Sequence, residues 1–138
     1  MIATAIRPEH LVAAWHDVGP MLARAVRHTP DKPDVFARLL GGTAQLWAVI
    51  EAGRPVAAIV TELTITGADR WCRVWLVAGE RVAAWVRGFL DQVEPWARAE
   101  GCIGLWASGR EGWARLAQRL GWHREGTDAG YPRWTWRF

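Results

Sequence analysis

Few side chains in this sequence combine a reactive type with a position that supports chemistry. Glu62 is the one carboxylate inside an apolar, strand-like segment, where burial would raise its pKa toward that of a general base. A strand end or an ion pair with an arginine is the more ordinary setting for such a group. Ser108 is the only serine, and capping of the helix that follows accounts for it. The four histidines have no cysteine or paired carboxylate at ligand spacing, so the sequence predicts no catalytic residue and no metal site.

Two cysteines fall at the starts of predicted strands. Cys72 and Cys102 are the only cysteines in the chain, and no secretory segment precedes them. A pair in this setting is typical of reduced, packed thiols rather than of a disulfide framework. We therefore expect both thiols to be free and buried.

Composition sets the scale of the protein. The 138 residues, about half of them apolar, are enough for one domain with its own core, which we expect to span residues 1–138. Sixteen arginines and one lysine give a net charge of +3, which favours acidic surfaces but includes no run of basic residues. No apolar run approaches the ~20 residues that a membrane span needs. The sequence predicts a soluble protein made in the cytoplasm, with no membrane partner.

The first half of the chain predicts a strand, helices and then a meander. Apolar periodicity indicates a strand over 2–6, a helix from Glu9 that Gly19-Pro20 interrupts or kinks and Thr29-Pro30-Asp31 ends, and a short helix over 34–40. Residues 44–51 and 55–66 are rich in β-branched types and are joined by a hairpin turn. Both alternating sets of the second strand are largely apolar, so we expect it to be central in a three-strand antiparallel meander.

The second half alternates strands and helices. It predicts a strand over 70–78, a helix over 80–100, a strand over 102–107 and a helix over 109–120 that ends at Gly121. Ser108 and Glu111 have the spacing of a capping box at the start of that last helix. Two further strands are expected at 123–127 and 131–138.

This order of elements resembles the GCN5-related N-acetyltransferase (GNAT) fold over essentially the whole chain. The segment from Ala114 to Trp122, with Leu116, Leu120 and Gly121, resembles the family's A-x-x-L/F-Y-x-x-x-G-F pattern. The resemblance implies an α/β (α+β) domain, in which a mixed sheet of six to seven strands carries helices on both faces.

The same resemblance implies that the family's chemistry is missing. The turn that should carry Q/R-x-x-G-x-G/A, and bind a cofactor pyrophosphate, contains Gly79 without the paired small residues. Glu80 is expected to put a carboxylate in the first turn of the following helix, where it would repel a pyrophosphate. Ala117 stands where the family has the tyrosine that protonates the coenzyme A thiolate, and the chain's one tyrosine is Tyr131. We therefore expect no cofactor and no cofactor-binding residue.

Eleven tryptophans in 138 residues are unusual. Trp85 and Trp96 lie at one edge of the helix over 80–100, beside its apolar stripe, and we expect both to be partly exposed. Tryptophan and arginine are enriched in the energetic centres of protein interfaces. The sequence thus offers a candidate interface made of Trp85, Trp96, Trp134, Trp136 and Phe138.

Two further segments are similar to small GNAT-like proteins from the virion-gene clusters of tailed bacteriophages. These segments are Arg73-Val74-Trp75-Leu76 and Gly109 to Arg115. The similarity implies a non-enzymatic structural protein of the virion that binds other virion proteins, at the head-to-tail region or inside the particle, after synthesis in the host cytoplasm. A homo-oligomer is left open. Two alternatives remain, an acetyl-CoA-dependent N-acetyltransferase with an atypical cofactor loop and a basic accessory domain that binds nucleic acid.

Overall fold

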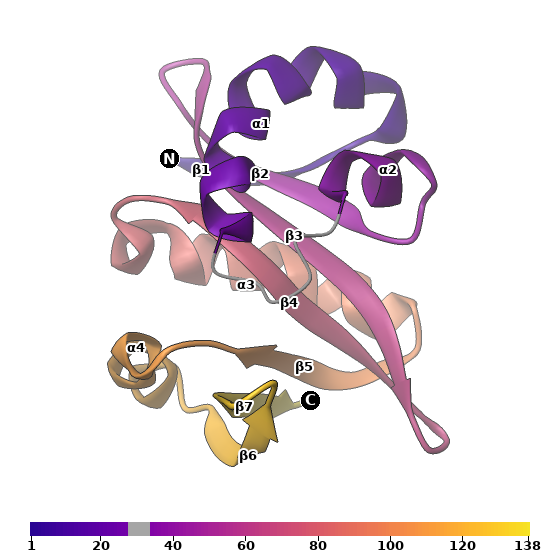
Figure 1. The fold of residues 1–138 in the computed structure, drawn as a ribbon, viewed down its shortest axis with the longest axis vertical. Helices are drawn as coiled ribbons and strands as arrows, with labels where there is room; N and C mark the ends of the chain where they lie inside the picture. The colour runs from indigo at the N-terminus through magenta and orange to yellow at the C-terminus, as the bar shows by residue number, and fades with distance from the viewer. Residues whose placement is uncertain (28–33) are drawn as a thin grey trace.

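Residues 1–27 and 34–138 are described by a computed structural model. The predicted helix end at Thr29-Pro30-Asp31 lies outside these residues. The elements, shown in Figure 1, are β1 (Ile2–Ile6), η1 (Pro8–His10), α1 (Leu11–Val26), α2 (Val35–Leu40), β2 (Gln45–Glu51), β3 (Arg54–Thr66), β4 (Asp69–Gly79), α3 (Val82–Ala99), β5 (Cys102–Ser108), η2 (Glu111–Trp113), α4 (Ala114–Arg119), β6 (His123–Asp128) and β7 (Tyr131–Arg137).

All strands belong to one seven-stranded sheet in the order β1-β2-β3-β4-β5-β7-β6. Neighbouring strands are antiparallel except β4 and β5, which are parallel and are connected through α3. The predicted mixed sheet and the predicted meander of β2, β3 and β4 are confirmed. Among the described residues, no helix is both long and apolar enough to cross a bilayer.

β3 is an inner strand of the sheet, between β2 and β4. Ala52 and Gly53 have φ values of 52° and 75°, which is the left-handed pair that a two-residue hairpin turn requires. The turn sets the register in which β3 pairs with β2.

Four consecutive residues of β3 are 0% exposed: Ala57, Ala58, Ile59 and Val60. Because consecutive strand residues point to opposite faces, β3 is covered on both sides, as its composition predicts.

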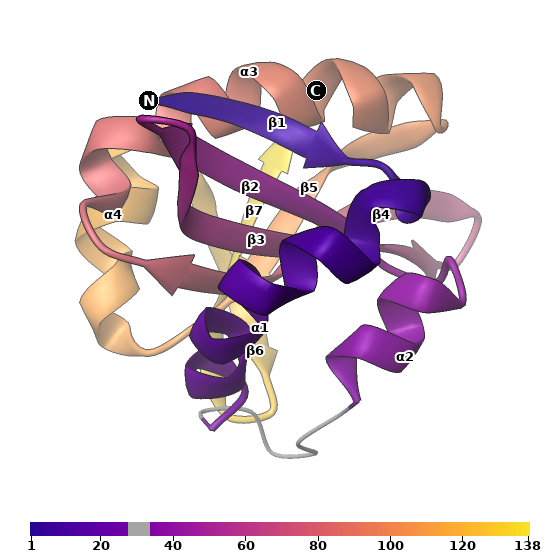
Figure 2. The same ribbon diagram turned by 90° about the horizontal axis from the view of Figure 1, so that it is seen from above.

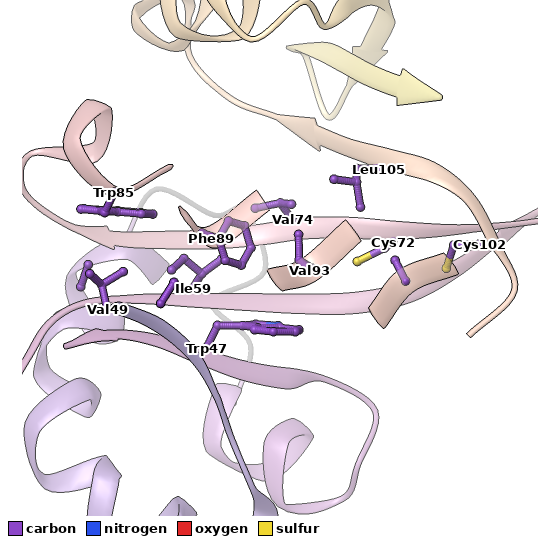
Figure 3. Packing of buried hydrophobic residues seen from close by; sticks show 13 residues of the cluster. Trp47, Val49, Ile59, Cys72, Val74, Trp85, Phe89, Val93, Cys102 and Leu105 are labelled. Carbon is purple, nitrogen blue, oxygen red and sulfur yellow. The ribbon is translucent and has the colours of Figure 1, made fainter. Parts of the chain in front are cut away.

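Two apolar cores lie on the two faces of the sheet. Figure 2 shows α1 and α2 on one face and α3 on the other. On the α3 face, the side chains of Phe89 and Val93 pack against β2, β3 and β4, and Trp47 meets Phe89 edge to face with 5.9 Å between ring centroids (Figure 3). On the other face, Val18 and Leu22 of α1 pack on β3 and β4.

Of the two outcomes predicted for Gly19-Pro20, an interruption or a kink, the structure has the kink: α1 continues through Pro20, and Figure 2 shows its axis turning along its length. The start of α3 differs from the prediction. The helix α3 begins at Val82 and has no acidic residue in its first turn. The expectation that Glu80 occupies that turn is wrong, because Arg81 adopts a left-handed conformation with a φ of 57° and starts the helix later.

The predicted capping box at Ser108 and Glu111 is also wrong. The Ser108 hydroxyl donates to Asp128 Oδ2 at 2.8 Å, and the Glu111 carboxylate pairs with Arg124 at 3.2 Å. The following turn, η2, is preceded by Arg110 and has no side-chain cap. The predicted stop at Gly121 is confirmed by its φ of 81°. Ser108 therefore links β5 to β6 instead of capping the helix.

Both cysteines are free and buried, as predicted. Burial, together with the neighbouring Cys102 thiol, raises the pKa of the Cys72 thiol from its usual value of 9.0 to about 12. A thiol that ionises less readily in the folded state stabilises the fold below its unfolded pKa. That stabilisation is lost as the pH rises from about 9 toward 12.

We predict that alkali destabilises the protein through Cys72. Between pH 9 and pH 12, the free energy of unfolding from urea titrations should fall by up to about 1.4 kcal/mol per pH unit. In Cys72→Ala the curve of free energy against pH should be clearly flatter, because alanine does not ionise; Cys102, whose pKa burial also raises, keeps part of the slope. Equal slopes in the two proteins would show that Cys72 does not ionise on unfolding.

Candidate functional site

The sheet opens between β4 and β5. Only the first parts of these strands pair, through Arg70 with Cys102, Cys72 with Leu105 and Arg73 with Trp106. Beyond Arg73 the strands diverge toward α4, as Figure 1 shows. The backbone of β4 from Val74 to Gly79 thus has no strand partner on the β5 side. A parallel sheet that opens at the carboxyl ends of its strands is a common location for a ligand.

A β-bulge accompanies this opening. In the pairing of β4 with β3, Val60 faces Leu76 and Thr61 faces Val74, so that Trp75 is the extra residue. Such bulges bend a strand and increase its twist, and they are frequent beside binding sites. The ring of Trp75 turns to the α1 and α2 face, where the Arg38 guanidinium lies 4.7 Å from its centroid.

The space between the diverging strands is a pocket of about 410 Å³. We call it the β4–β5 cleft and define it by its lining residues, which come mainly from β4, α3, β5, α4 and β7, with single residues from α1, α2, β3, η2 and β6. Its walls are mainly apolar, and the side chains that line them include Val77, Trp85, Val86, Phe89, Leu90, Ala107, Leu116, Ala117, Leu120, Trp122 and Trp134. Polar groups enter it from Arg73, Ser108, Arg110, Asp128 and Tyr131. An apolar cavity with a few polar groups is the usual form of a small-molecule site.

Glu62 lies beside this cleft within an ion-pair network. Its side chain is 15% exposed, and its two oxygens accept from Arg73 at 3.0 Å and from Arg38 at 3.4 Å. The ion pair expected from the sequence is therefore confirmed. Both carboxylate oxygens are engaged by cations, which makes Glu62 a positioning group for Arg73 rather than a free base.

The network continues from Arg73 into the cleft. Arg73 pairs with Asp128 Oδ2 at 3.4 Å, and the same oxygen accepts from the Ser108 hydroxyl. The Arg73 guanidinium also lies 4.8 Å from the centroid of Trp106, which Arg133 approaches equally closely. Residues from β3, β4, β5 and β6 are thus tied together at one mouth of the cleft.

Two buried side-chain nitrogens have no hydrogen-bond acceptor among the described residues. They are Arg73 Nε and Trp134 Nε1, and both residues line the β4–β5 cleft. A buried donor that lacks an acceptor costs about 1–3 kcal/mol of stability. Native proteins bury few such groups, and each one calls for a reason.

The turn from β4 into α3 adjoins the cleft, which Val77 and Val82 line on either side of the turn. Gly79 has a φ of 114°, and a Cβ there would lie 2.7 Å from Val56 O and from Ala57 Cβ, so glycine is needed for the close approach of the two strands. The side chain of the N-cap residue of α3, Arg81, makes no capping hydrogen bond. The Glu80 carbonyl accepts from Trp85 Nε1 at 3.0 Å, and Arg81 pairs with Glu51 at 2.6 Å.

The proposed interface residues do not form one exposed surface. Trp85 is 4% and Trp134 is 5% exposed. The expectation that Trp85 is partly exposed is wrong, because its ring packs in the α3 core with Phe89 and its N–H is satisfied. Trp134 faces into the cleft and offers no free surface.

The other three candidates are half-buried. Trp96 packs edge to face on Trp47 with 5.6 Å between centroids. Phe138 lies under Arg98, whose guanidinium is 4.5 Å from the ring centroid, and Trp136 pairs with Leu105 across the strands. Their role in an interface stays a prediction.

Within residues 1–27 and 34–138, no three histidine, cysteine or acidic side chains gather as a metal site would require.

Ala117, which stands where the GNAT resemblance implies a tyrosine, is buried and lines the cleft. Sequence reasoning missed Ser108 and Trp134 as cleft residues. Trp134 alternates with Trp136 and Phe138 in the sequence, which predicts that the three side chains share one face of the sheet. This pattern could have identified Trp134 as a residue of the covered face.

The sequence matches no protein-family model and no curated protein sequence. The fold is similar to solved structures of an aminoglycoside 6'-acetyltransferase type Ii (TM-score 0.74, 12% identity, 99% of this chain and 97% of that one) and of an N-acyl amino acid synthase from uncultured soil microbes (0.72, 12%, 99% and 90%). It is also similar to a GNAT-family acetyltransferase from Listeria monocytogenes (0.67, 13%, 99% and 94%). At these identities the similarity shows the fold alone. The chain has the GNAT fold, and the likeness to bacteriophage proteins stays a prediction.

We predict that Glu62 stabilises the protein by holding Arg73. Glu62→Gln should lower the free energy of unfolding by about 1–3 kcal/mol, because Arg73 loses a charged partner in a partly buried setting. Glu94→Gln is the control, since it breaks the more exposed pair with Arg98 on α3 and should cost under about 0.5 kcal/mol. Urea denaturation measures both, and equal losses would show that the network adds nothing.

Proposed function

We propose that the chain is an acyl-coenzyme A-dependent acyltransferase, in which the β4–β5 cleft binds the acyl-pantetheine arm and an amine is the acceptor. The observation that carries this proposal is the divergence of β4 and β5 around a largely apolar pocket of about 410 Å³. An extended arm with amide groups matches a strand that lacks a partner along one edge, because it can pair with that strand's backbone.

The phosphate end of the ligand has partial support. No acidic residue lies in the first turn of α3 and the side chain of its N-cap residue makes no capping hydrogen bond, so the amides of Val82 and Ala83 and the helix dipole are available to an anion. Arg81 precedes these amides, and its guanidinium pairs with Glu51 at 2.6 Å, so a pyrophosphate would compete with Glu51 for this cation. The paired small residues that the GNAT resemblance implies are absent.

Acyl transfer needs a proton donor for the leaving thiolate. Ala117 cannot supply one, and the Ser108 proton is committed to Asp128. Tyr131, the chain's one tyrosine, lines the cleft. Its hydroxyl is the remaining group of suitable chemistry, and we assign it the role of proton donor. The bound acyl-coenzyme A supplies the activated thioester.

A second candidate is a non-enzymatic GNAT-like protein of a tailed bacteriophage particle. Ala117 favours this candidate, because an alanine at the position of the proton donor leaves the fold intact but cannot protonate a leaving thiolate. Binding to other virion proteins, a homo-oligomer, a nucleic-acid partner and a location in the virion all stay predictions. Mass spectrometry of the purified source particle would test the location directly.

We predict saturable binding of acetyl-CoA in calorimetric titration, in the micromolar range. Ala107→Leu, which adds a larger side chain to the cleft wall, should weaken binding about tenfold or more. Ala99→Leu, on the exposed end of α3, is the matched control and should bind like the parent. Thermal melting checks that both variants fold. Absence of binding to the parent would remove the transferase proposal and favour the second candidate.

The role of Tyr131 gives a kinetic prediction. In assays that detect free coenzyme A released in the presence of a panel of amines, Tyr131→Phe should lower kcat about 100-fold or more, with little change in acetyl-CoA affinity. The variant keeps the ring and removes only the hydroxyl. If the parent binds acetyl-CoA but releases no coenzyme A with any amine, the chain is a binding protein. If Tyr131→Phe keeps full activity, another group donates the proton.

A further inference from the structure

Trp134 holds a buried hydrogen-bond donor that the fold does not use. Its side chain is 5% exposed, and its Nε1–H has no acceptor in the described part of the chain. Other tryptophans in this protein satisfy their indole N–H groups. Trp47 donates to Thr61 at 3.0 Å and Trp106 donates to Thr64 at 2.9 Å. Trp134 is therefore an exception that needs an explanation.

The position of Trp134 points to a ligand. In the pairing of β5 with β7 it lies opposite Ala107, a small residue that also lines the β4–β5 cleft. Because directly opposed residues share one face of a sheet, both are on the face covered by α3 and α4. Leu116, Ala117 and Leu120 of the α4 region line the same cavity. Trp134 thus adds a donor to the lining of the mainly apolar pocket proposed to hold the acyl-pantetheine arm.

The residues that line the cleft indicate which type of hydrogen-bond acceptor would fit the Trp134 N–H. A neutral N–H among apolar side chains matches a neutral oxygen on a largely apolar chain, whereas a phosphate would need cations beside it. The arginines that line the cleft are Arg38, Arg73 and Arg110, and two of them already pair with Glu62 or Asp128. A carbonyl oxygen of a thioester or an amide is the group that fits.

We propose that Trp134 Nε1–H donates a hydrogen bond to a carbonyl oxygen of the acyl-pantetheine arm and so fixes its depth in the cleft. This inference rests on the proposed function and deepens it. Trp134 then acts as a specificity-determining residue, because ligands without a carbonyl at that depth leave the buried N–H unpaired.

Trp134→Phe tests the inference because it removes the N–H and keeps an aromatic ring. Calorimetric titration with acetyl-CoA should show affinity weakened about fivefold to tenfold relative to the parent. Trp47→Phe, which loses an indole N–H that is bonded to Thr61 at a residue that does not line the cleft, should bind like the parent. Titration with coenzyme A distinguishes the two possible acceptors. If Trp134→Phe weakens the binding of acetyl-CoA alone, the acceptor is the thioester carbonyl. If it weakens the binding of acetyl-CoA and coenzyme A equally, the acceptor is a pantetheine amide.

The indole resonances of the ¹⁵N-labelled parent give a second readout that needs no variant to bind. The Trp134 Nε1–H signal, assigned by triple-resonance spectra, should move downfield when acetyl-CoA saturates the protein. If the parent binds acetyl-CoA but Trp134→Phe binds equally well, or the Trp134 signal does not move, the inference is wrong and the proposed function stands. If the parent binds neither probe, both are wrong.

Discussion

The structure depends on one constraint in the sheet, which is that β4 and β5 pair only over their first residues. A buried strand that loses its neighbour leaves polar backbone groups without partners, and such groups are expensive to bury. Here the bulge at Trp75 bends β4 away from β5, and side chains of α3, α4 and β7 line the resulting space. The cleft, its two unpaired donors and the network around Asp128 all lie where the strands separate.

The arginine-rich composition has a structural explanation in this arrangement. Arg73 and Arg133 lie on the ring of Trp106, Arg137 lies on Trp71, and Arg38 lies on Trp75. Guanidinium groups stack on aromatic faces and bind carboxylates at the same time, which an ammonium group does less well. Four of the sixteen arginines are thus placed over tryptophan rings, and two of them, Arg38 and Arg73, also pair with Glu62 and line the cleft.

Most of the fold could be predicted from the sequence, because α3 has a clear apolar period of 3.6 residues and β3 is a continuous run of apolar, often β-branched residues that begins after a turn. The details of the site could not, because they depend on contacts between distant residues. Ser108 fits a capping box locally, but its partner is Asp128, twenty residues further on. The late start of α3 depends on the left-handed Arg81, a conformation that an arginine does not signal. Trp85 could have been assigned to the core, since it lies four and eight residues before Phe89 and Val93 on one helical face.

The central claim is that the opening between β4 and β5 is the binding site of an acyl-coenzyme A. A crystal structure of the protein grown with coenzyme A tests it most directly. The account predicts density for the pantetheine arm between β4 and β5, with the phosphates at the start of α3 near Arg81 and a carbonyl oxygen within hydrogen-bond distance of Trp134 Nε1. Coenzyme A bound elsewhere on the molecule, or a cleft closed by continued pairing of β4 with β5, would contradict it.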